Sequence, residues 1–187
     1  MIGYAFTGSF CTLKRSFSEL EKLVGAGWNV QPIMSERVYA TDTRFGEARV
    51  FREKVEELCG NPIIHTVVDA EPLGPAKPLE ALILAPCTGN TLAKIAAGIT
   101  DSAVTMAAKA HLRCDRPTVI ALASNDSLSQ NLHNIAALLL RREVYFVPMR
   151  QDDPEKKPHS LVAEFSMLGD CLESALNGRQ RRPLFLG

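Results

Sequence analysis

The chain has 187 residues, enough for one domain that buries roughly 70% of the surface its unfolded form would expose. Its 21 basic and 21 acidic side chains cancel, so we expect neither nucleic acid nor an anionic membrane as a partner. The apolar runs are far shorter than the roughly 20 residues that cross a bilayer, and the first residues lack the pattern of a secretion signal. We therefore expect a cytoplasmic protein with a single domain over residues 1–187 and a flexible tail from about residue 177.

The five cysteines are odd in number, widely spaced and form no Cys-x-x-Cys pair. This pattern argues against a disulfide framework and against a zinc site. We expect reduced cysteines that mostly pack in the core, and no bound metal.

The first elements alternate between strand and helix. Residues 2–6 form an apolar run that predicts a strand, and apolar residues then recur at helical spacing from Phe10 to Val24. Residues 29–34 predict a second strand. Residues 43–58 predict a second helix, which we expect to end at Gly60.

The segment 61–80 interrupts this alternation. It holds four of the eleven prolines, so a long helix is excluded there. Residues 63–68 are compatible with a short strand. We expect the segment as a whole to pass over the functional site.

The alternation resumes in the rest of the chain. We predict three more strands and four more helices, with strands at 81–85, 117–123 and 143–147 and helices at 90–97, 102–112, 128–140 and 161–176. The polar stretch 151–160 predicts a loop. Because the strands are too apolar to face water on either side, the pattern predicts an α/β fold: a doubly wound, Rossmann-like or flavodoxin-like parallel sheet with helices on both faces.

In such a sheet, ligands bind beyond the carboxyl ends of the strands. Loops with hydroxyl or amide side chains follow four predicted strands, at 7–10, 35–37, 86–91 and 124–126. The first and third combine glycine with hydroxyls before a helix, where free backbone N–H groups favour a phosphate. The first loop lacks the P-loop lysine and the spaced glycines of a dinucleotide site, which favours a single phosphate. The same side chains also cap helices for purely structural reasons, and that alternative remains open.

The sequence APCTGNTLAKIAAGITDS at 85–102 resembles the signature of the homo-oligomeric flavin-containing decarboxylase superfamily. The TGS turn at 7–9 and Ser35 match other flavin-contacting positions of that superfamily. TRFGEA, AEPLGP, MAAKAHLR and QDDPEKKPHS, at 43–48, 70–75, 106–113 and 151–160, are similar to one branch of it, the dipicolinate synthase B subunits of spore-forming bacteria.

The resemblance implies FMN as the cofactor. Gly8, Ser9 and Ser35 would contact its phosphate and ribityl end, the 86–91 turn would line the isoalloxazine ring, and residues 124–125 would close the pocket. The implied cofactor-binding residues are Thr7, Gly8, Ser9, Phe10, Ser35, Pro86, Cys87, Thr88, Gly89, Asn90, Thr91, Ser124 and Asn125.

The resemblance also implies an activity and partners. The chain would be the flavoprotein component of an oxidoreductase that makes dipicolinate from a dihydrodipicolinate-type precursor during sporulation, in the mother cell. A dehydrogenase-like A subunit would carry NADP, and the chain itself would form a trimer or a dodecamer. The alternatives are an FMN-dependent decarboxylase or prenyltransferase-like enzyme, and a non-catalytic scaffold for the A subunit.

The sequence does not settle the catalytic residues, and the candidates are His65, Lys109 and Arg113. His65 lies near the place of the superfamily's catalytic histidine, but the 70–75 insertion follows it and we favour a packing role. Lys109 and Arg113 are four residues apart on one helix face, where they would either bind a dianionic ligand or face solvent. Cys87 has no evident base paired with it, so we expect it to pack.

Overall fold

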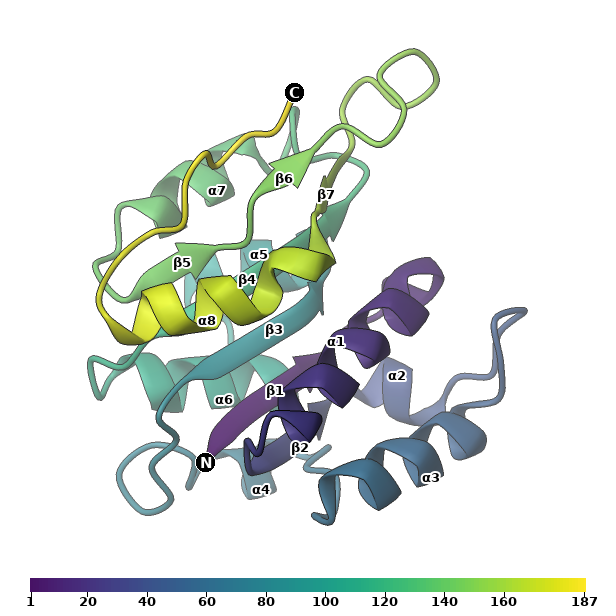
Figure 1. Ribbon diagram of the computed structural model, residues 1–187, viewed down its shortest axis with the longest axis vertical. Coiled ribbons are helices and arrows are strands. Elements are labelled where there is room, and N and C mark those ends of the chain that lie inside the picture. The colour runs from purple at the N-terminus through teal and green to yellow at the C-terminus, as the bar shows by residue number, and fades with distance from the viewer.

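The computed structural model describes residues 1–187 and contains one seven-stranded sheet (Figure 1). Four strands run parallel in the order β2-β1-β3-β4, and they are β2 (Val30–Met34), β1 (Ile2–Phe6), β3 (Leu82–Cys87) and β4 (Thr118–Ser124). This crossover order is that of a doubly wound sheet, so the predicted fold class is confirmed.

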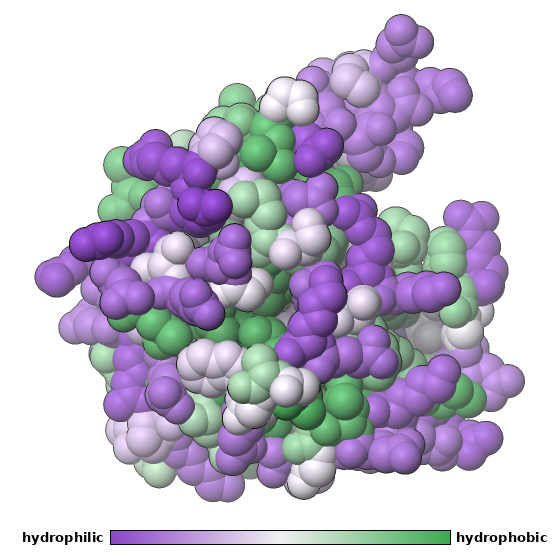
Figure 2. All heavy atoms as spheres, in the orientation of Figure 1, coloured by the Kyte–Doolittle hydropathy of each residue, from purple (hydrophilic) through white to green (hydrophobic).

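The second half of the sheet is mixed. β5 (Val144–Phe146) pairs in parallel with the first part of β4, whereas β7 (Leu161–Ala163) pairs antiparallel with its last two residues. β6 (Met149–Arg150) pairs antiparallel with β7. The loop between β6 and β7 projects from the molecule and is hydrophilic, as predicted for residues 151–160 (Figures 1 and 2).

Helices cover both faces of this sheet (Figure 1). On one face lie α1 (Leu13–Gly25), α2 (Glu36–Ala40), α3 (Ala48–Cys59) and α8 (Leu168–Leu176). On the other face lie α4 (Val67–Ala70), α5 (Gly89–Ala97), α6 (Ala103–Leu112) and α7 (Leu132–Leu139). None of these helices combines the length and the apolar character that a membrane span requires.

The hydrophobic core is split by the sheet into two clusters, of 23 and 22 buried residues. Successive side chains of β1 point to opposite faces of the sheet, so this one strand contributes to both clusters. Tyr4 and Phe6 belong to the first cluster and Ala5 to the second. The continuous apolar run at residues 2–6 is therefore explained, because β1 is buried on both faces of the sheet.

The segment 61–80 departs from its prediction. Only Ile64 forms a bridge, with Ile33, and no strand covers 63–68. Thr66 instead caps a short helix, because its side chain accepts a hydrogen bond from the Asp69 N–H at 3.1 Å. The segment then packs against the backbone of α6 at Gly74 and Ala110, so it does not pass over the site described below.

Three predicted helices begin later than expected, among them α7, which begins at Leu132 and not at residue 128, and the short helices α2 and α4 were not predicted. Residues 43–46 form a turn closed by the Thr43 N–H and the Gly46 carbonyl at 3.0 Å, so α3 begins only at Ala48. Leu161 and Val162 pair with β4 as strand β7, which delays α8 to Leu168. The five-residue helix α2 was not predicted, because it is too short to show an apolar period.

Candidate functional site

The loops after β1, β2 and β3 converge with the starts of α5 and α6 around one cavity of about 330 Å³. We call it the cradle. Its lining is entirely polar or glycine, with no hydrophobic side chain, and consists of Thr7, Gly8, Ser35, Glu36, Arg37, Thr88, Asn90, Thr91, Lys94 and Ser102.

Thr7 joins two walls of the cradle. It is 1% exposed, and its hydroxyl donates to the Pro86 carbonyl at 2.8 Å and accepts from the Thr88 N–H at 2.9 Å. The loop after β1 and the turn after β3 are therefore held in one fixed arrangement. Most of the hydrogen-bonding capacity of Thr7 is used in this way.

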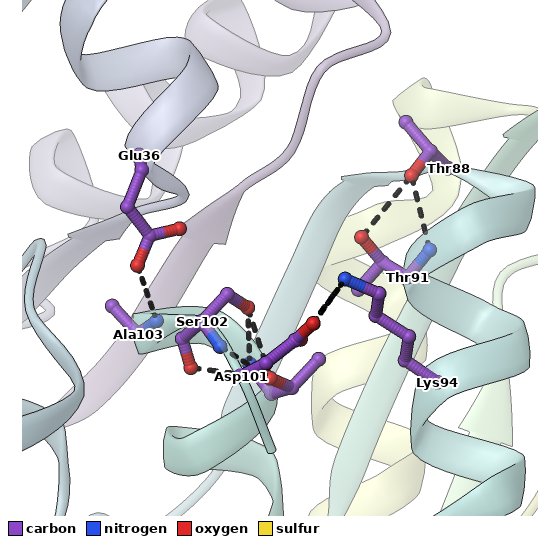
Figure 3. A network of polar contacts seen from close by, with 8 residues as sticks. Glu36, Thr88, Thr91, Lys94, Asp101, Ser102 and Ala103 are labelled. Atoms are coloured by element: carbon purple, nitrogen blue, oxygen red, sulfur yellow. Dashed lines mark hydrogen bonds and ion pairs between the residues drawn. The ribbon is translucent and has the colours of Figure 1, made fainter. Parts of the chain in front are cut away.

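Three of the cradle hydroxyls are helix N-caps. Ser35 accepts from the Val38 N–H at 3.4 Å. Thr88 accepts from the Thr91 N–H at 3.2 Å, and Ser102 forms a capping box at the start of α6 (Figure 3). The structural alternative left open by the sequence thus holds for these residues. Capping also has an electrostatic result, because α5 and α6 both present their positive N-terminal ends to the same cavity.

Charged groups add to this field. The Lys94 ammonium lies 2.7 Å from Asp101 Oδ2, and this hydrogen bond lowers the pKa of the Asp101 carboxyl (Figure 3). Glu36 accepts from the Ala103 N–H of α6 at 3.1 Å, which ties the loop after β2 to that helix. Arg37 is exposed and forms no ion pair. Lys94 is thus paired with Asp101, with two of its three N–H donors used, and Arg37 is the cation of the cradle that remains unpaired.

The opposite side of the α5 N-terminus is closed by a second polar group, which we call the clamp: Ser124, Asp126 and Asn131. Asp126 accepts from the Ser124 hydroxyl, and from Asn131 Nδ2 at 2.9 Å; these bonds lower the pKa of its carboxyl. A Cβ on Gly89 would lie 2.6 Å from Asn131 Nδ2 and 2.7 Å from Asp126 Oδ1. Only glycine therefore allows the clamp to approach this helix.

The structure brings six of the thirteen predicted cofactor-binding residues to the cradle: Thr7, Gly8, Ser35, Thr88, Asn90 and Thr91. The other seven do not line it, and they are Ser9, Phe10, Pro86, Cys87, Gly89, Ser124 and Asn125. Phe10 faces a neighbouring apolar cleft, and the Ser124 hydroxyl is directed to Asp126. Cys87 is buried, and burial raises its pKa to about 12, which keeps the thiol protonated.

None of the candidate catalytic residues lines the cradle. The His65 ring stacks on Tyr39 with centroids 3.7 Å apart, and the Arg52 guanidinium also packs on the Tyr39 ring. Lys109 and Arg113 line a separate cavity. Four cradle residues were not among the predicted cofactor-binding residues: Glu36 and Arg37, which lie in the predicted 35–37 loop, and Lys94 and Ser102. The spacing of Asn90 and Lys94, four apart in one helix, was the available signal that the lysine lies on the same face.

Comparison with known proteins places this geometry in a family. The family described as Flavoprotein matches residues 1–165. The dipicolinate synthase B subunit of Bacillus subtilis (strain 168) is 43% identical over 185 residues, which cover 99% of this chain and 92% of the relative. The chain belongs to the flavoprotein family, in the branch of the dipicolinate synthase B subunits. The resemblance inferred from residues 85–102 and the branch motifs is thereby confirmed.

Solved structures agree with this family. The crystal structure of the dipicolinate synthase B subunit from Bacillus halodurans C superimposes with a TM-score of 0.91 at 40% identity, covering 100% of this chain and 95% of the other. AnUbiX (PadA1), solved in complex with FMN and dimethylallyl pyrophosphate, matches with a TM-score of 0.66 at 19% identity, covering 96% and 95%. The second likeness shows a shared fold.

Proposed function

We propose that the cradle binds FMN and that this chain is the flavoprotein component of a dipicolinate synthase. The observation that carries the proposal is the meeting of the α5 and α6 N-termini with Lys94 and Arg37 around one wholly polar cavity. Backbone N–H groups at helix N-termini together with cationic donors favour a phosphate. In a flavoprotein, the natural phosphate is that of the flavin nucleotide.

The residues of the cradle suit the separate parts of FMN. Lys94 and Arg37 would bind the phosphate, and the hydroxyls of Ser35 and Ser102 would reach the ribityl chain. Asn90 is exposed and its side chain makes no hydrogen bond within the chain, so its amide is free to bond a polar edge of the flavin ring.

The cradle lacks the apolar wall that the flat flavin ring requires, since no hydrophobic side chain lines it. We infer that a second copy of the chain supplies this cover, so that the complete site forms in a homo-oligomer, a trimer or a dodecamer. If so, the apparent FMN affinity should rise with protein concentration in the range where the oligomer assembles.

Analytical ultracentrifugation measures the oligomeric state, and fluorescence titration at the same protein concentrations measures FMN affinity. Tight FMN binding by a monomer would contradict this part of the proposal.

The proposed reaction converts a dihydrodipicolinate-type ring, made during sporulation in the mother cell cytoplasm, into the aromatic pyridine of dipicolinate. Two electrons and two protons leave the ring, as one hydride and one proton. Bound FMN would supply the acceptor for this hydride, and NADP on a dehydrogenase-like A subunit would supply the final acceptor of the same two electrons. The contribution of this chain is to hold the acceptor in a fixed position through Thr7 and the caps.

The test uses the purified chain with FMN, the A subunit and enzymatically generated precursor, without oxygen. We expect a yellow preparation whose colour bleaches when precursor is added, with ultraviolet absorbance of up to one equivalent of pyridine product appearing at the same time. Adding NADP with the A subunit should then restore the yellow colour and allow further product to form. A colourless chain that still activates the A subunit would establish a scaffold instead. Release of carbon dioxide from an added carboxylate substrate, without pyridine product, would establish a decarboxylase.

A further inference from the structure

A second cavity, of about 200 Å³, lies between α5 and α6 near the C-terminal end of α7. Lys109 and Arg113 line it, and so does Arg141, which lies two residues after the end of α7. The two cations that the sequence placed on one helix face therefore meet a third cation from a distant part of the chain. We call this cavity the basic pocket.

The three cations of the basic pocket are unpaired. None takes part in an ion pair, and none donates a side-chain hydrogen bond to a backbone carbonyl or to another side chain. No acidic residue lines the pocket. Positive charge near the C-terminal ends of helices is favourable by itself, but capping would place these donors on the last carbonyls. Here the donors remain free for an external anion.

The shape of the basic pocket limits the kind of anion. Ile95, Ile99 and Leu112 form an apolar part of its wall, which favours a ligand with a carbon frame over inorganic phosphate. Its volume is well below the roughly 300–1,000 Å³ of pockets for nucleotide- or drug-sized ligands. A compact organic molecule with two carboxylates matches both the size and the charge.

The helices α5 and α6 lie next to both the basic pocket and the cradle. On α5, Lys94 lines the cradle and Ile95 the basic pocket. At the start of α6, the N-cap Ser102 lines the cradle, and the Thr105 side chain that bonds to it at 2.9 Å lines the basic pocket. The loop between these helices therefore lies between the two cavities, but no residue lines both.

We propose that the basic pocket is a binding site for a small organic dicarboxylate, separate from the cradle. Pyridine-2,6-dicarboxylate is the probe of choice, because it is rigid and carries both carboxylates on one small ring. The site does not depend on FMN, so its test is independent of the function proposed above.

Isothermal titration of the full chain with pyridine-2,6-dicarboxylate, with and without saturating FMN, tests the proposal. We expect binding in both states, with affinity that falls as salt is added. Arg113→Gln and Arg141→Gln should each weaken it about tenfold or more, because each removes a hydrogen bond between a charged donor and a carboxylate. Pyridine-2-carboxylate, with one carboxylate, should bind more weakly than the dicarboxylate.

The matched control is Arg142→Gln. Arg142 is the adjacent residue, is highly exposed, lies 3.4 Å from Glu143 and does not line the basic pocket. Its replacement should leave dicarboxylate affinity unchanged. The proposal is wrong if the wild-type chain does not bind the probe, if FMN displaces it, or if Arg142→Gln weakens binding as much as Arg141→Gln. Loss of A-subunit association in Arg141→Gln without any probe binding would instead make this a protein-docking surface.

Discussion

The two sides of the α5 N-terminus follow opposite principles. On the cradle side, Thr88, Asn90 and Lys94 surround open, wholly polar space. On the clamp side, Asp126 and Asn131 leave no room beside Gly89 for even one carbon atom. The same helix end is therefore accessible on one side and rigidly packed on the other, which is the arrangement that a preorganised ligand site requires.

Gly89, in the turn between β3 and α5, is a glycine for a reason that differs from the usual one in phosphate-binding turns. Glycine in such a turn suggests that a ligand approaches the backbone closely. At Gly89 the close approach is made by the protein itself, through the Asn131 amide and the Asp126 carboxylate. Packing against the end of β4 and the loop that follows it, rather than contact with the ligand, requires the absence of a side chain here.

The largest expected effect comes from filling the clamp side. Gly89→Ala would place a carbon 2.6 Å from Asn131 Nδ2, and such overpacking costs about 1–3 kcal/mol of unfolding free energy. Urea unfolding measures the loss. The control is Gly169→Ala, because Gly169 lies in α8 with nothing within 4 Å of the new carbon; it should raise stability by about 0.5–1 kcal/mol. Equal stability of both variants would show that the clamp side chains can move aside without cost, and would contradict this prediction.

A loss of similar size is expected from removing the Thr7 hydroxyl. Thr7→Val keeps the shape but leaves the partly buried Thr88 N–H without its acceptor, at a cost of about 1–3 kcal/mol. FMN affinity should fall as well, because the two loops lose their connection. Thermal unfolding and fluorescence titration give the two values. Thr41→Val serves as the control, since Thr41 is exposed.

The clamp carboxylate should make stability depend on pH. The pKa of Asp126 is lowered in the folded chain, so its contribution is present above the unfolded value of about 4 and is lost as the pH falls through the folded value. Asp126→Asn should cost about 1 kcal/mol near neutral pH and flatten the acid limb of the stability profile. Urea midpoints measured between about pH 3 and pH 7 test this. A variant with an unchanged acid limb would exclude Asp126 as the source.

The smallest effect on stability is expected on the open side. Lys94→Met breaks a pair whose aspartate is 53% exposed, so solvent screening should leave the unfolding free energy almost unchanged. FMN affinity should nevertheless fall about tenfold or more, through loss of a charged hydrogen bond to the phosphate. Lys22→Met is the matched control, because the Lys22–Glu19 pair has the same 2.7 Å separation on a different helix. Equal FMN affinity in the two variants would remove Lys94 from the phosphate site.

The fold was largely predictable because its core strands are uniformly apolar. Residues 2–6 and 81–85 could hardly form anything but buried strands, and Gly60 ends α3 with the left-handed φ of 64° that only glycine adopts easily. Leu161 to Ala163 misled the prediction, because three apolar residues before a helix carry no period of their own. Their partner, the end of β4, is nearly forty residues away.

The site was less predictable than the fold. A hydroxyl at a strand end shows in the sequence, but its direction does not: Ser35 opens to the cradle, whereas Ser124 turns to Asp126. Arg37 and Lys94 were missed because isolated cations usually face solvent. Only the tertiary arrangement of β2, α5 and α6 brings these two charges to the same cavity.

Strand β4 pairs with two different strands along its length, and this affects the order in which the nascent chain can complete its site. The start of β4 pairs with β5, whereas Ala123 and Ser124 pair with residues 162 and 161 of β7. The Ser124 carbonyl also accepts a hydrogen bond from the Ser160 hydroxyl at 3.2 Å. During synthesis on the ribosome, the strand end that carries the clamp therefore remains unpaired until almost the whole polypeptide has emerged. Ribosome-bound fragments that stop before residue 160 should form the sheet around β1 and β3 while this corner is still open to proteases.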